Sequence, residues 1–274
     1  LIKGASMGEI APIMCGSALF GIGMHTLLED MVECFPSPID TTLYIAKDIK
    51  NNKYMQVKIN DTGLFSALIF KTIADPFVGK LSMFRVITGR AKSDTIVYNT
   101  NKEKEEKIGT MYFLKGKQQF QTAEIKAGDI GAVAKLQYTT TGDTLCDSKR
   151  LLMFDTMDFP QPVFSRAIVT KSKGDEDKIS NGLTKLLEED PTFSISRSIE
   201  NAETIISGLG STHLHVIVSK LKNKFGVEVS LEIPKVAYRE TIRKVSDVQG
   251  KHKKQSGGHG QYGDVKIKFE PRID

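Results

Sequence analysis

The sequence predicts a multi-domain protein of the β and α+β classes, and three observations support this prediction. The chain has 274 residues, which is more than one average domain holds, so two or three domains are expected. The spacing of its apolar residues changes along the chain, from a helical stretch to a period of two and then to alternating strand and helix patterns. Apolar residues make up 40% of the chain, as in ordinary globular cores.

Residues 1–40 have the pattern of the end of an α/β domain. Ala11-Pro-Ile-Met-Cys15 predicts a short buried strand, and a helix follows whose apolar residues share one face: Leu27, Leu28, Met31, Val32 and Phe35. Pro36-Ser-Pro38 is expected to end this helix, because proline cannot continue its hydrogen bonds. A strand and one helix cannot form a core alone. Since the chain also begins at Leu1 without a methionine, we expect a piece of a longer protein.

Residues 41–150 have the period of two that is typical of β-strands. Apolar residues alternate with polar or small ones in several short runs: Val57 and Ile59; Val86; Ile96 and Tyr98; Met111 and Phe113; Ile130, Ala132, Ala134 and Leu136. Turn signals separate the runs: Asp61-Thr-Gly63, Thr88-Gly89, Lys115-Gly116, Gly128-Asp129 and Gly142-Asp143. Short strands at this spacing predict a closed antiparallel β-barrel. The charge run Asn101–Lys107 is predicted to be a solvated hairpin loop.

Residues 160–233 alternate between strand and helix patterns in the order β-α-β-β-α-β. Strands are predicted at Val163–Val169, Phe193–Ile195, Thr204–Ile206 and Val227–Leu231. The first helix is expected to stop at Asp190-Pro191. This order is that of a ferredoxin-like domain. We expect one face of its sheet to be covered by apolar residues of the two helices: Leu183, Leu186, Leu187, Leu214, Ile217 and Leu221.

Residues 234–274 form an incomplete α/β segment that begins with a basic cluster and ends with a strand. The cluster comprises Arg239, Arg243, Lys244, Lys251, Lys253 and Lys254. On charge alone it is interpreted as a solvated linker. Gln255–Gly263 is glycine-rich but precedes a strand instead of a helix, so it is not a phosphate loop, and its plain interpretation is a flexible hairpin. Val265, Ile267 and Phe269 alternate with polar residues, which predicts a half-buried strand.

Bulk properties exclude some classes of protein. The net charge of +5 permits an RNA partner without requiring one. Apolar runs such as Ala67–Phe70 are far shorter than the ~20 residues that span a bilayer, so no membrane association is expected. The three cysteines, Cys15, Cys34 and Cys146, are widely separated, which favours reduced intracellular thiols over a disulfide framework. We therefore expect a soluble, cytoplasmic protein.

The histidines and acidic clusters do not form a catalytic or metal site. His213 and His215 are two positions apart on a predicted helix, so they point away from each other and cannot bind one metal together. His213 is expected to be a packed or capping residue. Glu188-Glu189-Asp190 are consecutive, and consecutive helical side chains diverge, which disfavours a paired acid and base. We expect no catalytic residue and no metal site in this chain.

Several motifs, in order along the chain, resemble elongation factor G. Cys15-Gly-Ser-Ala18 resembles the fifth guanine-nucleotide motif, and Phe35-Pro-Ser-Pro38 resembles the hinge that leaves the G domain. Three stretches are similar to the family's translation-factor barrel, domain II: Asp75-Pro-Phe-Val-Gly-Lys80, Ala127-Gly-Asp-Ile130 and Thr140–Cys146. Three more are similar to domain III and its exit: Glu188–Phe193, Thr204–Gly208 and Val236–Thr241. Gln255–Gly263 is similar to the start of domain IV. The likeness covers essentially the whole chain.

The resemblance implies an internal piece of a ribosome-dependent translational GTPase that promotes tRNA–mRNA translocation. In this family domain II contacts small-subunit rRNA, domain III relays the nucleotide state, and domain IV reaches toward the decoding site. GTP and Mg²⁺ would bind in the intact parent protein, whereas this fragment is expected to lack the catalytic P-loop core, to be inactive and to be a monomer. Ser17 and Ala18 would lie near the guanine. Contacts with ribosomal RNA, tRNA and mRNA would come from Lys251, Lys253, Lys254, Gly257, Gly258, Gly260 and Gln261.

One motif departs from the family pattern and leaves alternatives open. The family has Gly-Glu-Leu-His-Leu-Glu at the start of the second helix of domain III, where this chain has Gly210-Ser-Thr-His-Leu-His215. Ser211 and Thr212 still suit a helix start, because their hydroxyls can accept hydrogen bonds from unpaired amides. The departure indicates a divergent paralogue. The alternatives are a tetracycline ribosomal-protection-type factor and a non-catalytic RNA-binding protein with borrowed translation-factor domains.

Overall fold

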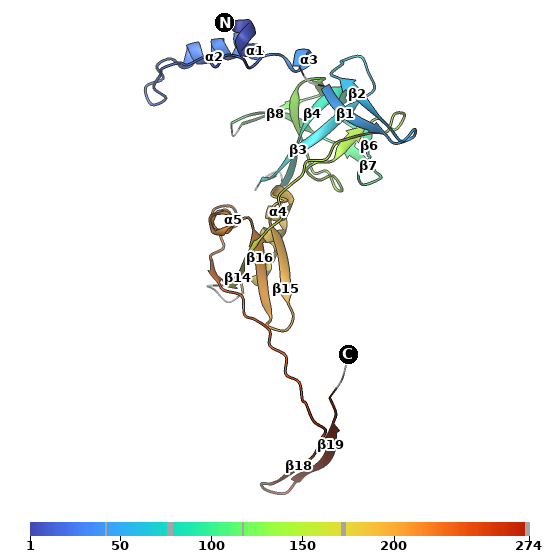
Figure 1. Ribbon diagram of the computed structural model, residues 1–274, viewed down its shortest axis with the longest axis vertical. Coiled ribbons are helices and arrows are strands. Elements are labelled where there is room, and N and C mark those ends of the chain that lie inside the picture. The colour runs from blue at the N-terminus through green and yellow to red at the C-terminus, as the bar shows by residue number, and fades with distance from the viewer. Residues whose placement is uncertain (42, 76–78, 117, 171–173, 272–274) are drawn as a thin grey trace.

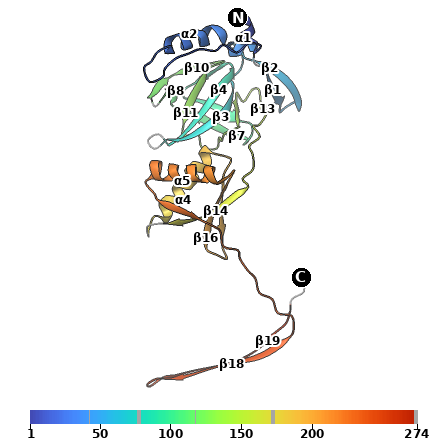
Figure 2. The same cartoon turned by 60° about the vertical axis from the view of Figure 1, so that its left-hand side comes forward.

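The computed structural model describes residues 1–41, 43–75, 79–116, 118–170 and 174–271 (Figure 1). Its parts follow one another along an elongated molecule. An N-terminal helical segment lies beside a β-barrel, a ferredoxin-like domain follows, and an extended connection leads to a two-stranded hairpin at the far end (Figures 1 and 2). The predicted multi-domain β and α+β class is confirmed.

The N-terminal segment contains α1 (Ile2–Ser6), α2 (Met24–Cys34) and α3 (Pro38–Thr41). The predicted helix is α2, and it ends before Pro36 as expected. The buried strand predicted at Ala11–Cys15 is wrong, because these residues are exposed and have no strand pairing. A strand needs a neighbour for its backbone hydrogen bonds, and in the described chain no sheet edge pairs with this stretch. The apolar side of α2 is likewise left without a buried residue.

The barrel consists of short antiparallel strands in three sheets. Its strands are β1 (Leu43–Asp48), β2 (Lys53–Lys58), β3 (Ser66–Asp75), β4 (Gly79–Thr88), β5 (Arg90–Lys92), β6 (Thr95–Asn99), β7 (Lys104–Ile108), β8 (Met111–Lys115), β9 (Gln118–Thr122), β10 (Glu124–Lys126), β11 (Ile130–Ala134), β12 (Thr144–Cys146) and β13 (Leu152–Phe154). The largest sheet has the order β7-β6-β12-β3-β4-β11-β8-β9, and the smaller ones are β13-β1-β2 and β10-β5. Among the described residues, the barrel is therefore enclosed by three sheets and not by one continuous ring of strands.

Most strands of the barrel share one apolar core. Buried residues of β3 to β8 and of β10 to β12 meet in it, among them Ile69, Phe84, Ile108, Met111 and Ile125. A second cluster lies under the small β13-β1-β2 sheet and includes Val57, Leu152 and Phe154. Because side chains alternate between the two faces of a strand, the period of two found in the sequence supplies these inward positions.

The charge run Asn101–Lys107 is only partly a loop. The turn ends at Glu103, and β7 starts at Lys104, so the prediction of a solvated loop is wrong for the second half of the run. The physical reason is the alternation in β7, which turns Glu106 and Ile108 inward while Glu105 and Lys107 stay exposed. Glu106 is only 4% exposed, and the polar contacts described below compensate for its burial.

The ferredoxin-like domain has the predicted β-α-β-β-α-β order. Its elements are β14 (Phe164–Thr170), α4 (Glu176–Glu189), β15 (Ser194–Ser198), β16 (Glu203–Gly208), α5 (Ser211–Phe225) and β17 (Val229–Glu232), and the sheet order is β15-β16-β14-β17. Five of the six predicted helix residues are buried: Leu183, Leu186, Leu214, Ile217 and Leu221. Leu187 is 37% exposed, because the step from Leu186 turns it away from the sheet, and Ile179 is buried in its stead.

The C-terminal part is a long hairpin of β18 (Ser246–Gln255) and β19 (Gly260–Phe269). The strand predicted at Val265–Phe269 lies within β19, but its apolar residues are exposed and not half-buried. No other described element covers that face of the hairpin, since every residue of β18 and all but one of β19 are exposed. The interpretation of the basic cluster as a linker is wrong for Lys251, Lys253 and Lys254, which lie in β18.

Candidate nucleic-acid interface

The hairpin carries the residues for which we expected RNA contacts. Its strands pair from Ser246 opposite Phe269 to Gln255 opposite Gly260. The turn between them is tight: the His259 amide donates to the Gly257 carbonyl at 2.6 Å. Gly257 has φ +71°, which favours glycine because a Cβ is strained in this region. The glycines thus allow a narrow tip with little side-chain bulk.

The pairing register divides the expected site residues between two faces. Lys253 lies opposite Tyr262 and shares its face with Lys251, whereas Lys254 lies directly opposite Gln261 on the other face. Only Gly257 and Gly258 belong to the turn. The glycine-rich stretch predicts one loop for all four residues, but Gly260 and Gln261 begin β19, so this prediction is wrong for these two. The long strands extend the pairing further toward the tip than the glycine-rich sequence indicates.

Sequence reasoning did not select Tyr262, which lies on the face of Lys251 and Lys253. The Lys251 Nζ is 5.6 Å from the centroid of its ring, and the tyrosine side chain is 65% exposed. Its hydroxyl donates to Asp264 Oδ2 at 3.3 Å, and Gln249 Nε2 donates to Asp264 Oδ1 at 2.7 Å. The sequence carried no signal for this beyond an aromatic residue in a glycine-rich stretch, because the pairing register places Tyr262 opposite a lysine.

This arrangement suits single-stranded nucleic acid. Lysines attract phosphates, and an exposed aromatic ring can stack on a base of any sequence. On the opposite face Gln261 can both donate and accept hydrogen bonds. Asp264 lowers the positive charge of the face that carries Tyr262. It also orients Tyr262 and Gln249 through the hydrogen bonds that it accepts from them.

The two residues expected near a guanine lie between α1 and α2, in the helical segment at the other end of the molecule from the hairpin (Figure 1). Ser17 and Ile22 exchange backbone hydrogen bonds of 3.0 and 3.1 Å, and the Phe20 amide donates to Ser17 Oγ at 3.4 Å. Ala18 is exposed in the turn that this pairing closes. Among the residues that the structure describes, no three His, Cys, Asp or Glu side chains are grouped so that they could hold a metal ion.

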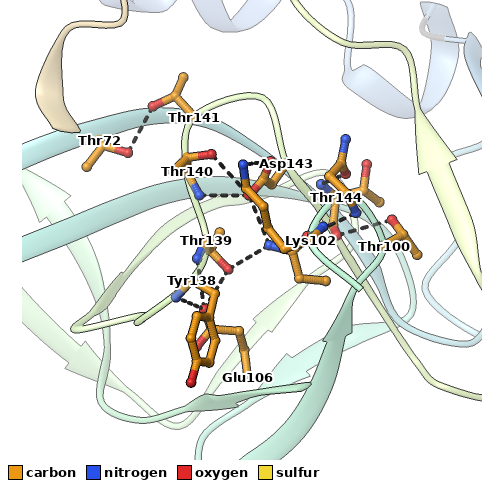
Figure 3. A network of polar contacts seen from close by, with 12 residues as sticks. Thr72, Thr100, Lys102, Glu106, Tyr138, Thr139, Thr140, Thr141, Asp143 and Thr144 are labelled. Carbon is orange, nitrogen blue, oxygen red and sulfur yellow. Dashed lines mark hydrogen bonds and ion pairs between the residues drawn. The ribbon is translucent and has the colours of Figure 1, made fainter. Parts of the chain in front are cut away.

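A buried polar network shapes the loop of residues 137–143 in the barrel (Figure 3). Glu106 Oε1 accepts from the Tyr138 amide at 2.6 Å, the Thr139 amide at 2.8 Å and the Thr139 hydroxyl at 3.0 Å. Its Oε2 accepts from the Gln137 amide at 3.1 Å. A carboxylate that gathers consecutive amides in this way fixes the path of the backbone.

Asp143 holds the other end of the same loop. Its Oδ2 accepts from the Thr140 amide at 2.8 Å and from Asn99 Nδ2 at 2.9 Å, and Lys102 Nζ lies 3.9 Å from Oδ1 (Figure 3). The Thr144 amide donates to Asn101 Oδ1 at 2.8 Å. The polar residues of the Thr140–Cys146 motif are therefore explained by the shape of the loop.

His213 is a packed residue, one of the two roles expected for it, and its ring binds the amide of the residue that precedes the N-cap of α5. Its Nδ1 accepts from the Leu209 amide at 3.1 Å, and its Nε2 is 3.0 Å from Asp190 Oδ2. Burial raises the pKa of Asp190, but hydrogen bonds from Thr192 and His213 outweigh burial, so the pKa lies below its usual value. The hydroxyls after Gly210 do not cap α5, since no side-chain hydrogen bond of the described residues caps its N-terminus.

In the part of the chain that the structure describes, none of the helices has the length and apolarity needed to cross a membrane. Two stretches named in the sequence predictions lie partly outside the described residues. These are residues 76–78 of the Asp75–Lys80 motif and residues 272–274 of the last predicted domain.

Comparison with known families gives three matches in the order of the chain. The model of elongation factor G domain 2 matches residues 64–148, that of elongation factor G domain III matches residues 159–233, and that of elongation factor G domain IV matches residues 234–273. A crystal structure of a protein from Thermus thermophilus is similar to this chain with a TM-score of 0.66 and 31% sequence identity. The similarity covers 97% of this chain and 38% of that protein. The chain belongs to the elongation factor G family of translation factors.

Proposed function

We propose that this chain is part of a ribosome-dependent GTPase that promotes tRNA–mRNA translocation, and that it supplies the domains that contact the ribosome and relay the nucleotide state. The observation that carries this proposal is the hairpin. It matches the family's domain IV, lies at the far end of an elongated molecule, and presents lysines, an exposed tyrosine and a narrow glycine tip. These are groups that bind RNA backbone and unstacked bases.

The nucleotide and its metal would be bound in the intact parent protein and not by these residues. Triphosphate binding needs a phosphate cradle and a Mg²⁺ site together. The segment that resembles the guanine motif offers the exposed turn at Ser17 and Ala18, and no carboxylate group of the described chain is arranged for a metal. We therefore propose that this chain alone is inactive. We also propose that the intact parent protein hydrolyses GTP and acts as a monomer in the cytoplasm.

The two faces of the hairpin would make different contacts with RNA. Lys251 and Lys253 attract phosphates beside Tyr262, while Lys254 and Gln261 on the opposite face meet a second strand or a backbone edge. Gly257 and Gly258 allow the tip to approach the RNA closely. The hairpin would thus enter the region of codon and anticodon with a contact on either side.

The test is Gln261→Asp in the intact factor, because it replaces a group that donates and accepts with one that only accepts and repels phosphate. We expect slowed or frame-imprecise tRNA–mRNA movement in a single-round assay, with ribosome-stimulated GTP hydrolysis nearly unchanged. Gln121→Asp, at an exposed position of β9, is the matched control for the added charge. Unchanged movement and reading frame in Gln261→Asp would remove the role assigned to the hairpin.

A further inference from the structure

Where the barrel contacts the ferredoxin-like domain, the backbone of one barrel residue, Ala74 in β3, is hydrogen-bonded to the second domain. The Ala74 amide donates to Glu189 Oε2 at 3.1 Å, and the Ala74 carbonyl accepts from Lys224 Nζ at 3.2 Å. Glu189 ends α4, and Lys224 lies in the last turn of α5. α4 packs against β3 in the same place. Both hydrogen-bonding groups of one barrel residue are thus bound by the second domain.

The three charged side chains of this contact are Glu189, Lys220 and Lys224, and both lysines form ion pairs with the carboxylate. Glu189 Oε1 accepts from Lys220 Nζ at 2.7 Å, and Oε2 accepts from Lys224 Nζ at 2.6 Å. The Glu189 side chain is 12% exposed, and the two lysines are partly exposed. Burial raises the pKa of Glu189, but hydrogen bonds from Lys220, Lys224 and the Ala74 amide outweigh it and lower the pKa overall. The carboxylate is therefore ionised and fully engaged at neutral pH.

The geometry makes this contact specific but weak enough to open. Charge-assisted hydrogen bonds are directional, so they fix an orientation as well as a distance. The contact also requires α4 and α5 to be packed correctly, because its carboxylate and its lysines come from different helices. The lysines are partly accessible to water, however, so salt weakens the contact in part, although less than it weakens a fully exposed pair.

We propose that Glu189, Lys220 and Lys224 form a latch on the backbone of Ala74, which holds the ferredoxin-like domain in one orientation on the barrel and opens when the two domains move. The latch goes beyond the proposed function, since it requires neither ribosome nor nucleotide. It also gives a role to the Glu188–Phe193 stretch, whose acids were not explained by catalysis. Glu189 binds the barrel, while Asp190 fixes the following turn through Thr192 and His213.

The test measures the distance between the two domains in the 274-residue chain. Nitroxide labels are attached to Gln121→Cys in the barrel and Asn181→Cys in α4, both exposed positions, with Cys15→Ser and Cys34→Ser removing the accessible native thiols. Double electron–electron resonance then reports the distribution of distances. We expect one narrow distribution for the parent chain at low salt and a smaller broadening of it at high salt. In Glu189→Gln and in Lys224→Met we expect a distribution at least twice as broad as that of the parent chain at low salt.

The matched control is Glu188→Gln, which removes the same charge from the exposed neighbouring position of α4 and should leave the distribution narrow. Circular dichroism checks that every variant retains its helices. A narrow distribution in both Glu189→Gln and Lys224→Met would overturn the proposal. So would a parent chain that is already as broad as these variants, since the proposal rests on one fixed orientation and not on ribosome binding.

Discussion

Replacing Glu106 by glutamine removes the charge from a carboxylate that binds three consecutive amides of the loop 137–143. The side chain keeps its size, so the variant changes hydrogen bonding without leaving a cavity. The glutamine oxygen can take the place of Oε1 and accept from Tyr138 and Thr139. Its NH₂ group then faces the Gln137 amide, where a donor meets a donor.

The expected cost follows from these four hydrogen bonds. A bond to a charged group contributes about 1.5–3 kcal/mol, and one to a neutral group about 0.5–1.5 kcal/mol. Three weakened bonds at about 1 kcal/mol each and one lost bond at about 1.5–3 kcal/mol come to about 4–6 kcal/mol. Water at the partly buried Gln137 amide and the lower cost of burying a neutral amide offset part of this loss, so we expect the free energy of unfolding of the barrel to fall by about 2–4 kcal/mol. With a urea slope of about 2 kcal/mol per molar, the unfolding midpoint falls by about 1–2 M.

Tyrosine fluorescence during urea unfolding is a suitable assay, because the chain has no tryptophan and seven tyrosines, most of them in the barrel strands and loops. Glu105→Gln is the matched control: Glu105 is the exposed neighbour on the other face of β7, and its change should stay within about 0.5 kcal/mol. Equal effects of the two substitutions, or a loss below about 0.5 kcal/mol for Glu106→Gln, would refute the reasoning.

Three further predictions concern other parts of the chain. Ile217→Ala should cost about 2–5 kcal/mol, because Ile217 lies on the fully buried face of α5, whereas Val216→Ala at an exposed position of the same helix should cost little; hydrogen exchange of α5 in urea measures both. Burial raises the pKa of Cys146 to about 11, so at pH 8 alkylation followed by mass spectrometry should find Cys15 modified and Cys146 protected until the chain is denatured. Because the pKa of Glu189 is lowered in the folded chain, its carboxylate stabilises the latch at pH values above the ordinary pKa of 4.5, and this stabilisation is lost as the pH falls through the lower folded pKa. Acid should therefore broaden the interdomain distances of the parent chain but not those of Glu189→Gln.

Apolar periodicity predicted the elements whose pattern lies within a few residues of the chain. Strands such as β4 and β11, the β-α-β-β-α-β order, and the buried face of Leu183, Leu214 and Ile217 all follow from residues two to four positions apart. The same reasoning failed at Ala11–Cys15, where a strand pattern has no partner in the described chain. It failed again at Glu106, because nothing in a run of charged residues indicates that one of them is buried and accepts hydrogen bonds from amides far along the chain.

The candidate interface was predicted in composition but not in arrangement. The lysines and glycines of residues 251–261 were visible as a cluster, but the pairing register of β18 and β19 decides that Lys253 joins Tyr262 on one face and Lys254 joins Gln261 on the other. A shift of one residue would exchange the faces, and composition does not contain that register.

The sequence by itself determined the family, the order of the domains and most of the apolar faces, since each depends on motifs or on spacing within a few residues. Only the tertiary structure decided which polar groups meet. Glu189 and Lys224 reach Ala74 across 115 and 150 positions of the chain, and Glu106 reaches Thr139 across 33. A hydrogen bond depends on a few tenths of an ångström and on the direction of the donor. That precision arises from the packing of whole domains and cannot be read from the spacing of residues along the chain.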